Sequence, residues 1–224
     1  MHGSHLIRKE TNMKIVLIGD SIREGYDRYV KQAFDGVAMV CYPPENCRFT
    51  TYIIRNLIEW KTNMNWGDDV DLIHWNAGCW DNLIMSDGEN LISLEQYRNN
   101  VDRICRLIKQ YFPYAKMIFA TTTPVMEEGF QGLPYRRLNT DTERYNEAAC
   151  EIVQKHGGTI NDLYGLLKDN HRELHSDRTH YYSKEGTQVI TNQVIACIEE
   201  ALHIQAKPLD YDLLFGKKED IVGT

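Results

Sequence analysis

The chain has 224 residues, enough for one α/β domain or at most two small ones. Hydrophobic residues make up 42% and charged residues 25%, so the chain can bury a core at this length, and disorder is excluded as its main character. The 25 Lys and Arg residues stand against 32 Asp and Glu, and the resulting net charge of −7 disfavours general binding to nucleic acid.

The sequence also disfavours a membrane protein. No apolar run approaches the ~20 residues of a membrane span, and residues 1–12 lack the apolar stretch of a secretory signal. We therefore expect a cytoplasmic protein, unless a signal peptide was removed upstream. The 6 cysteines are scattered without a C-x-x-C pair, so we expect reduced, mostly buried thiols.

Five short apolar segments are predicted to be strands. Residues 13–18 (MKIVLI) form a continuous apolar run, as expected of a strand buried on both faces of a parallel sheet. The segments of similar character further along the chain are residues 37–41, 70–75, 116–121 and, more briefly, 159–160.

Helical periodicity occupies the stretches between these strands. The clearest stripe lies in residues 94–111, and the other helical segments are residues 22–34, 50–60, 142–156 and 183–202. Strands that alternate with helices in this way favour right-handed βαβ crossovers. The predicted fold class is α/β, a three-layer α/β/α sandwich with a mainly parallel five-stranded sheet.

One domain over residues 13–203 is the expected organisation, between an N-terminal tail or cloning remnant (1–12) and a C-terminal extension (204–224). The extension loses the helical period but keeps apolar residues, namely Tyr211, Leu213, Leu214 and Phe215. We expect them to pack on the domain or on a second subunit, so a homodimer through this extension is one prediction.

Two long loops, residues 76–90 and 124–139, follow predicted strands. Structureless stretches of this length in a compact domain are usually functional. Both should open at the carboxyl edge of the sheet, where open α/β sheets bind their ligands.

The tripeptide Gly19-Asp20-Ser21 follows the first predicted strand directly. A serine on a strand-to-helix turn exposes its hydroxyl at the sheet edge, where it suits a nucleophile. Its own N–H lies at the start of the helix and could stabilise the developing oxyanion, and one such donor is worth roughly 2.7–4 kcal/mol. The alternative is structural. Ser21 and Glu24 also match a capping box, in which the serine caps the following helix.

A second polar constellation, Asp177-Arg178-Thr179-His180, precedes the last predicted helix. Histidine can take the proton of a serine hydroxyl and return it to a leaving group, and a carboxylate can hold the imidazole in the required tautomer. A short turn would let His180 reach Ser21 with Asp177 behind it. The alternative is a solvated turn in which Asp177 is a local cap.

Together these segments resemble the SGNH, or GDSL-like, hydrolase superfamily over most of residues 13–202. Residues 121–125 (TTTPV) resemble its fourth block, and residues 183–186 (SKEG) its usual continuation after the histidine. The resemblance implies a flavodoxin-like sandwich and an esterase with the catalytic residues Ser21, His180 and Asp177.

Two middle blocks depart from the family pattern. Arg48 stands where the second block normally has a glycine, and Trp80 stands where the third block normally has an asparagine that donates to the oxyanion. We expect the oxyanion hole to consist of the N–H groups of Ser21 and Arg48 and the side-chain amide of Asn76.

The resemblance implies a serine ester hydrolase that removes a short acyl group through an acyl-enzyme, with O-acetyl on a carbohydrate as the first expected substrate. Asp20, Gly78 and Trp80 are expected to bind the substrate, and the Trp80 indole would stack on a sugar face. No cofactor is expected, and the expected partner is a small-molecule or carbohydrate ester. The alternative functions for the same fold are a lysophospholipase or thioesterase and a non-catalytic carbohydrate-binding module.

Other classes fit the residues less well. His171 and His175 near Asp177 and His180 are zinc-ligand types, but Glu173 comes two residues after His171 rather than one as in H-E-x-x-H, so no metal is expected. No serine lies in the G-x-S-x-G elbow of α/β-hydrolases, and residues 19–25 make a poor phosphate-binding loop.

Overall fold

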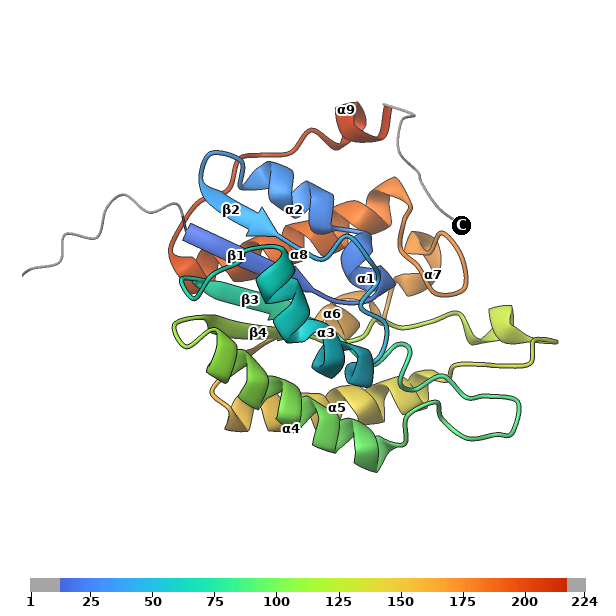
Figure 1. Cartoon of the computed structure of the whole chain (residues 1–224). Helices are drawn as coiled ribbons and strands as arrows, with labels where there is room; N and C mark the ends of the chain where they lie inside the picture. Colours follow the sequence, from blue (N-terminus) through green and yellow to red (C-terminus); the bar gives the residue numbers. More distant parts are fainter. Residues whose placement is uncertain (1–12, 217–224) are drawn as a thin grey trace, which may run out of the picture.

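Parallel strands in the order β2-β1-β3-β4-β5 form the central sheet, and Figure 1 labels the first four of them. The computed structural model describes residues 13–216. Its strands are β1 (Met13–Ile18), β2 (Ala38–Cys41), β3 (Leu72–Trp75), β4 (Lys116–Ala120) and β5 (Thr159–Asn161). Each lies at a predicted segment, with bounds that differ by at most two residues, and the order is that of flavodoxin-like folds.

Helices cover both faces of this sheet (Figure 1). They are α1 (Ser21–Glu24), α2 (Asp27–Ala33), α3 (Thr50–Asn63), α4 (Leu94–Tyr111), the 3-10 turn η1 (Glu127–Phe130), α5 (Asn139–Lys155), α6 (Leu163–Leu167), α7 (His171–Leu174), α8 (Lys184–Leu202) and α9 (Tyr211–Gly216). One apolar core lies between the sheet and α3, α4 and α5, and a second between the sheet and α1, α2, α6 and α8. The predicted three-layer sandwich is confirmed.

Strand β1 explains why its sequence is a continuous apolar run. Ile15 and Leu17 pack in the core beneath α2 and α8, whereas Val16 and Ile18 pack in the core beneath α3 and α4. All four side chains are at most 1% exposed, because alternate residues of a strand point to opposite faces and helices cover both.

The single helix predicted over residues 22–34 is wrong, because the chain breaks between α1 and α2. Tyr26 leaves the helical region with φ −124°, and its buried hydroxyl lies 3.2 Å from Nδ1 of His74 in the middle of the sheet. Gly25 lies against Tyr182, and a Cβ added at Gly25 would come within 2.8 Å of that ring. The break thus places Tyr26 in the core and leaves space for the Tyr182 ring beside Gly25.

The described part of the C-terminal extension contacts the domain. The Phe215 ring stacks on Tyr29 of α2 with the centroids 5.7 Å apart, and the buried Tyr211 donates from its hydroxyl to Asn192 of α8 at 2.9 Å. Residues 1–12 and 217–224 of the two predicted tails lie outside the described residues, and the homodimer stays a prediction. None of the described helices is long and apolar enough to cross a membrane.

The cysteines are free thiols in the structure. Cys47, Cys79 and Cys105 are buried, and the other three are half-buried. Burial raises the pKa of the Cys47 and Cys79 thiols to about 11, so both are neutral near the candidate site.

Candidate active site

Ser21 is the first residue of α1, just beyond the carboxyl end of the interior strand β1. The residue that caps this helix is Asp20, whose Oδ1 accepts the Ile22 N–H at 2.9 Å. The Glu24 carboxylate accepts from the side chain of Asn46 at 2.9 Å. The capping-box alternative is therefore wrong, since Asp20 supplies the cap that this alternative assigned to Ser21.

His180 lies in the loop before α8, and both of its ring nitrogens have partners. Nε2 lies 2.9 Å from Oγ of Ser21, and Nδ1 lies 2.8 Å from Oδ2 of Asp177. The structure thus brings Ser21, from the start of the domain's sequence, into one hydrogen-bonded chain with His180 and Asp177, from near its end. This is the arrangement that a nucleophile, a base and an orienting carboxylate would require.

Asp177 has a second role in its own loop. Its Oδ1 accepts the backbone N–H groups of Thr179 at 2.7 Å and His180 at 2.8 Å. Partial burial raises the pKa of Asp177, but the hydrogen bonds from the His180 ring and these N–H groups outweigh it and hold the pKa below its ordinary value. The carboxylate is thus ionised and requires the proton on Nδ1, which leaves Nε2 to accept from the Ser21 hydroxyl. One carboxylate therefore both caps its own turn and binds the His180 ring.

Asp20 and Asn76 lie in the interior behind Ser21. Neither has exposed surface, and the Asn76 amide donates to Oδ1 of Asp20 at 2.8 Å. Burial raises the pKa of Asp20. Gly19 permits this pairing, because a Cβ added there would lie 1.9 Å from Oδ1 of Asn76. The structure thus places Asp20 beneath the serine rather than on the surface that a substrate meets.

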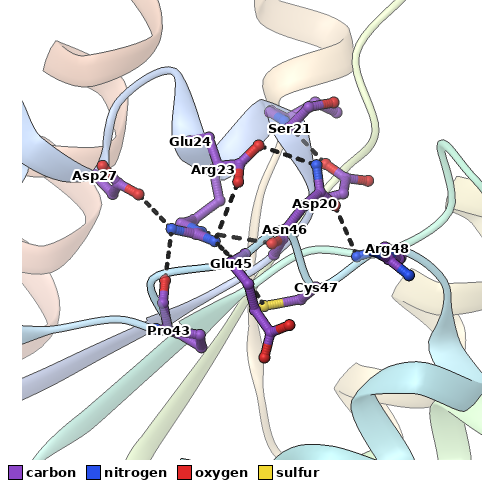
Figure 2. Close-up of polar contacts among 12 residues, drawn as sticks. Asp20, Ser21, Arg23, Glu24, Asp27, Pro43, Glu45, Asn46, Cys47 and Arg48 are labelled. Carbon is purple, nitrogen blue, oxygen red and sulfur yellow. Dashed lines mark hydrogen bonds and ion pairs between the residues drawn. The ribbon is translucent and has the colours of Figure 1, made fainter. Parts of the chain in front are cut away.

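Arg48 has a left-handed backbone conformation of the kind that favours glycine, with φ 52°. Figure 2 shows how this conformation is held, because the Arg48 N–H donates to Oδ1 of Asn46 at 2.8 Å and the Asn46 amide donates onward to Glu24. The donor that the sequence assigned to the oxyanion hole therefore already has a partner.

The buried guanidinium of Arg23 holds this loop against α1. It donates to the carbonyl oxygens of Pro43 and Glu45 and pairs with the Asp27 carboxylate (Figure 2). The N–H of Cys47 donates to the Gly19 carbonyl at 3.0 Å, which ties the other end of the loop to the turn that carries Ser21.

The sequence matches no family model and no curated protein. Solved structures do match. A lipase/acylhydrolase from Enterococcus faecalis superposes with a TM-score of 0.68 at 19% identity, over 88% of this chain and 100% of that one. A GDSL-like lipase from Bacteroides thetaiotaomicron superposes with a TM-score of 0.63 at 16% identity, over 84% of this chain and 88% of that one. The acetyl xylan esterase AlAXEase superposes with a TM-score of 0.63 at 14% identity, over 83% of this chain and 100% of that one.

The chain has the fold of the GDSL-like hydrolases. Identities this low establish the fold alone. On that fold, the Ser21 turn lies near the beginning of the domain's sequence and the His180 loop near its end, as the resemblance of the sequence blocks predicted.

Tyr182 borders the candidate site, and its position there was not predicted from the sequence. Its ring stacks on His180 with the centroids 4.6 Å apart and the planes 17° apart, and its hydroxyl donates to the Ser21 carbonyl at 2.6 Å. The only signal in the sequence was its place two residues after the histidine. Tyr182 therefore connects the two halves of the site.

The loop that carries Gly78 and Trp80 is fastened to the start of α3. Asp81, fully buried, accepts from the Thr50 hydroxyl at 2.5 Å and from the Thr50 N–H at 3.1 Å. Gly78 has φ 137° and leaves no space for a side chain, since a Cβ would lie 2.6 Å from the Thr122 hydroxyl. Trp80 itself is partly exposed.

The histidines of the zinc alternative lie at α7 and just after it. Nδ1 of His175 lies 3.2 Å from the His180 carbonyl oxygen, and its ring packs on Tyr181 with the centroids 4.0 Å apart. In residues 13–216, no group of three His, Cys, Asp or Glu side chains is arranged to hold a metal ion.

Proposed function

We propose that the protein is a serine ester hydrolase. The observation that carries this proposal is the hydrogen-bonded chain from Asp177 through His180 to Ser21, with contacts of 2.8 and 2.9 Å. It lies at the carboxyl edge of a fold shared with structures described as lipases, acylhydrolases and esterases. A nucleophile, a base and an orienting group in this order are the requirements of acyl transfer.

In the proposed reaction, Oγ of Ser21 attacks the ester carbonyl carbon while Nε2 of His180 takes the hydroxyl proton. When the tetrahedral intermediate collapses, the bond to the alcohol oxygen breaks and His180 returns the proton to that oxygen. A water molecule, deprotonated by His180, then attacks the acyl-enzyme and releases the carboxylic acid. The ionised Asp177 stabilises the imidazolium that forms in each step.

The oxyanion needs hydrogen-bond donors near Oγ. The Ser21 N–H donates to no acceptor among residues 13–216, so it is the donor open to the substrate. Arg48 and Asn76 are the further proposed donors to the oxyanion. The Arg48 N–H would share its hydrogen with Asn46, and the Asn76 amide carries a second hydrogen beside the one it donates to Asp20.

A short acyl group on a carbohydrate is the proposed substrate. Support comes from the partly exposed indole of Trp80 in the adjoining loop, because an indole face stacks well on a sugar ring. Two of the similar structures are described as an acetyl xylan esterase and an acetyl-xylooligosaccharide esterase. Lysophospholipids and acyl thioesters are the alternative substrates of the same nucleophile.

One observation favours a non-catalytic carbohydrate-binding module as the second candidate. Two of the three expected oxyanion donors, at Arg48 and Asn76, already have partners in the structure. The catalytic reading is stronger, because a binding module needs no base within 2.9 Å of a serine hydroxyl and no carboxylate behind that base.

Hydrolysis of p-nitrophenyl esters tests the proposal. Wild type should release nitrophenol from the acetate faster than from longer acyl esters, and both Ser21→Ala and His180→Ala should abolish this turnover. Ser86→Ala is the matched control, since Ser86 is an exposed serine in the 76–90 loop. If the wild type hydrolysed none of these esters faster than the two site variants, the hydrolase proposal would be rejected and the binding module favoured.

A further inference from the structure

Arg137 is a buried cation whose terminal nitrogens have no acceptor in the part of the chain that the structure describes. Its side chain belongs to a residue only 9% exposed, its Nε donates to the Cys79 carbonyl at 2.6 Å, and its guanidinium carbon lies 5.8 Å from the centroid of the Phe130 ring. Over residues 13–216, the two terminal nitrogens have no hydrogen-bond acceptor and no carboxylate within 4.0 Å. They are not sealed from solvent, since neither is among the fully enclosed polar atoms.

The loop that carries Arg137 is fixed at the carboxyl edge of the sheet. Ile84 and Arg136 exchange two backbone hydrogen bonds, of 2.9 and 3.0 Å, which join the 124–139 loop to the 76–90 loop. The acceptor of Arg137 is the carbonyl of Cys79, next to Trp80. The guanidinium also lies close enough to Asp20, the neighbour of Ser21, to oppose the rise in the pKa of that carboxyl.

A second guanidinium borders the same ring. Arg178, between Asp177 and His180, has its guanidinium carbon 5.4 Å from the Phe130 centroid and donates to the Tyr135 hydroxyl at 3.2 Å. No ion pair of the described residues includes it either. The net charge of the protein is −7, yet two arginines beside its candidate site have no carboxylate partner among residues 13–216.

A buried guanidinium whose terminal nitrogens contact no carboxylate is costly, so an arginine held in this way indicates a partner that arrives from outside. The two terminal nitrogens of a guanidinium present parallel N–H groups that match the two oxygens of a carboxylate. We propose that Arg137 binds a carboxylate of the ester substrate, so that the enzyme prefers esters with an anionic group near the reacting carbonyl. This inference rests on the proposed esterase function.

A carboxylate can enter from either side of the ester bond. It lies on the acyl side in a half-ester of a dicarboxylic acid and on the alcohol side in an acetylated hydroxy acid, such as an acidic sugar. Two matched pairs separate these sources. Monomethyl succinate is compared with methyl butyrate for the acyl side, and O-acetylglycolate with ethyl acetate for the alcohol side, with acid release followed by pH-stat titration at low salt.

We expect one anionic ester to exceed its neutral partner at least 10-fold in kcat/KM. Arg137→Gln should lower this anionic-to-neutral ratio at least 10-fold, and Arg137→Lys should restore part of it. The matched control is Arg136→Gln, which removes the same charge from an exposed residue of the same loop and should keep the wild-type ratio. An anionic-to-neutral ratio near one in wild type, or a ratio unaffected by Arg137→Gln, would overturn the inference.

A binding measurement separates this inference from the esterase proposal. In the Ser21→Ala background, calorimetric titration with the preferred anionic ester requires no turnover. Binding that Arg137→Gln weakens at least 10-fold and Arg136→Gln leaves unchanged would support the carboxylate site even if wild type hydrolysed no ester. Hydrolysis of neutral esters alone, with no Arg137-dependent binding of either anionic ester, would keep the esterase and reject the carboxylate site.

Discussion

The imidazole of His180 is held by three different side chains. Asp177 accepts from one ring nitrogen, Ser21 lies against the other, and the Tyr182 ring covers a face of the imidazole. Tyr182 also donates to the Ser21 carbonyl, so it holds His180 and Ser21 in a fixed relative position. A shift of about 1 Å in a catalytic base greatly lowers the rate of a reaction. The contacts that hold His180 in place would therefore contribute to the proposed reaction.

Arg48 is held in the left-handed region that favours glycine, and this makes a prediction about stability. Arg48→Gly and Arg48→Ala both remove the guanidinium from its place 5.1 Å over the Tyr52 ring, so their difference isolates the backbone. We expect the glycine variant to be more stable than the alanine variant by about 1 kcal/mol, because an L-residue at positive φ is strained by roughly that amount. Urea unfolding measures the difference.

Two outcomes would contradict the backbone strain at Arg48. If the alanine variant were as stable as the glycine variant, or more stable, the lower entropy of the unfolded alanine chain would outweigh any strain in the native loop. The same pair of substitutions at an exposed residue with helical φ, such as Arg55 in α3, is the control. There alanine should be the more stable by about 1 kcal/mol.

Among the elements, helix α3 is joined to the 76–90 loop through the buried carboxyl of Asp81. Asp81 accepts two hydrogen bonds from Thr50, the first residue of α3, and the Thr50 hydroxyl accepts from Asn100 of α4. Burial raises the pKa of Asp81 to about 7, because the hydrogen bonds from Thr50 oppose the cost of desolvation only in part. The contact between loop and helix should thus depend on pH.

The free energy of unfolding of wild type should fall relative to Asp81→Asn as the pH rises. The folded protein holds the Asp81 proton up to about pH 7, whereas the unfolded chain releases it near the ordinary value of 3.8. This group therefore stabilises the fold most fully below pH 4, and its contribution disappears as the pH approaches 7. Between pH 5 and 8, we expect the difference between the two proteins to change by about 3 kcal/mol.

Urea unfolding of both proteins at pH 5, 6, 7 and 8 measures this change. Other titrating groups cancel in the comparison, since the two chains differ only at position 81. Parallel stability curves over this pH range would show that Asp81 is ionised in the native state throughout, contrary to the effect of its burial.

The whole fold could largely be predicted from the sequence, and the reason is physical. Strand β1 is buried on both faces, so its apolar run has a single interpretation, and α4 begins and ends at the predicted residues 94 and 111. The break in the helix predicted over 22–34 could not be predicted, because it depends on Tyr26 reaching His74 and on Tyr182 packing against Gly25. Those contacts join residues 48 or more positions apart.

The candidate site was predictable only where its residues stand in short motifs. Ser21, Asp177 and His180 lie in two tight turns, and their order in the chain suggested their roles. The partners of Arg48 and Asn76 depend on side-chain hydrogen bonds that neither spacing nor periodicity specifies. Arg137 was not singled out either, because its burial follows from the pairing of two loops more than 30 residues apart.

Covalent capture of the nucleophile tests the central claim of this account most directly. With a fluorophosphonate, Oγ of Ser21 should form a bond to phosphorus as fluoride leaves and His180 takes the serine proton. Peptide mass spectrometry should locate the adduct on Ser21 in wild type and in Ser86→Ala, and find labelling much slower in His180→Ala. Labelling of a different residue, or an equal rate in wild type and His180→Ala, would contradict the assignment of Ser21 as the activated nucleophile.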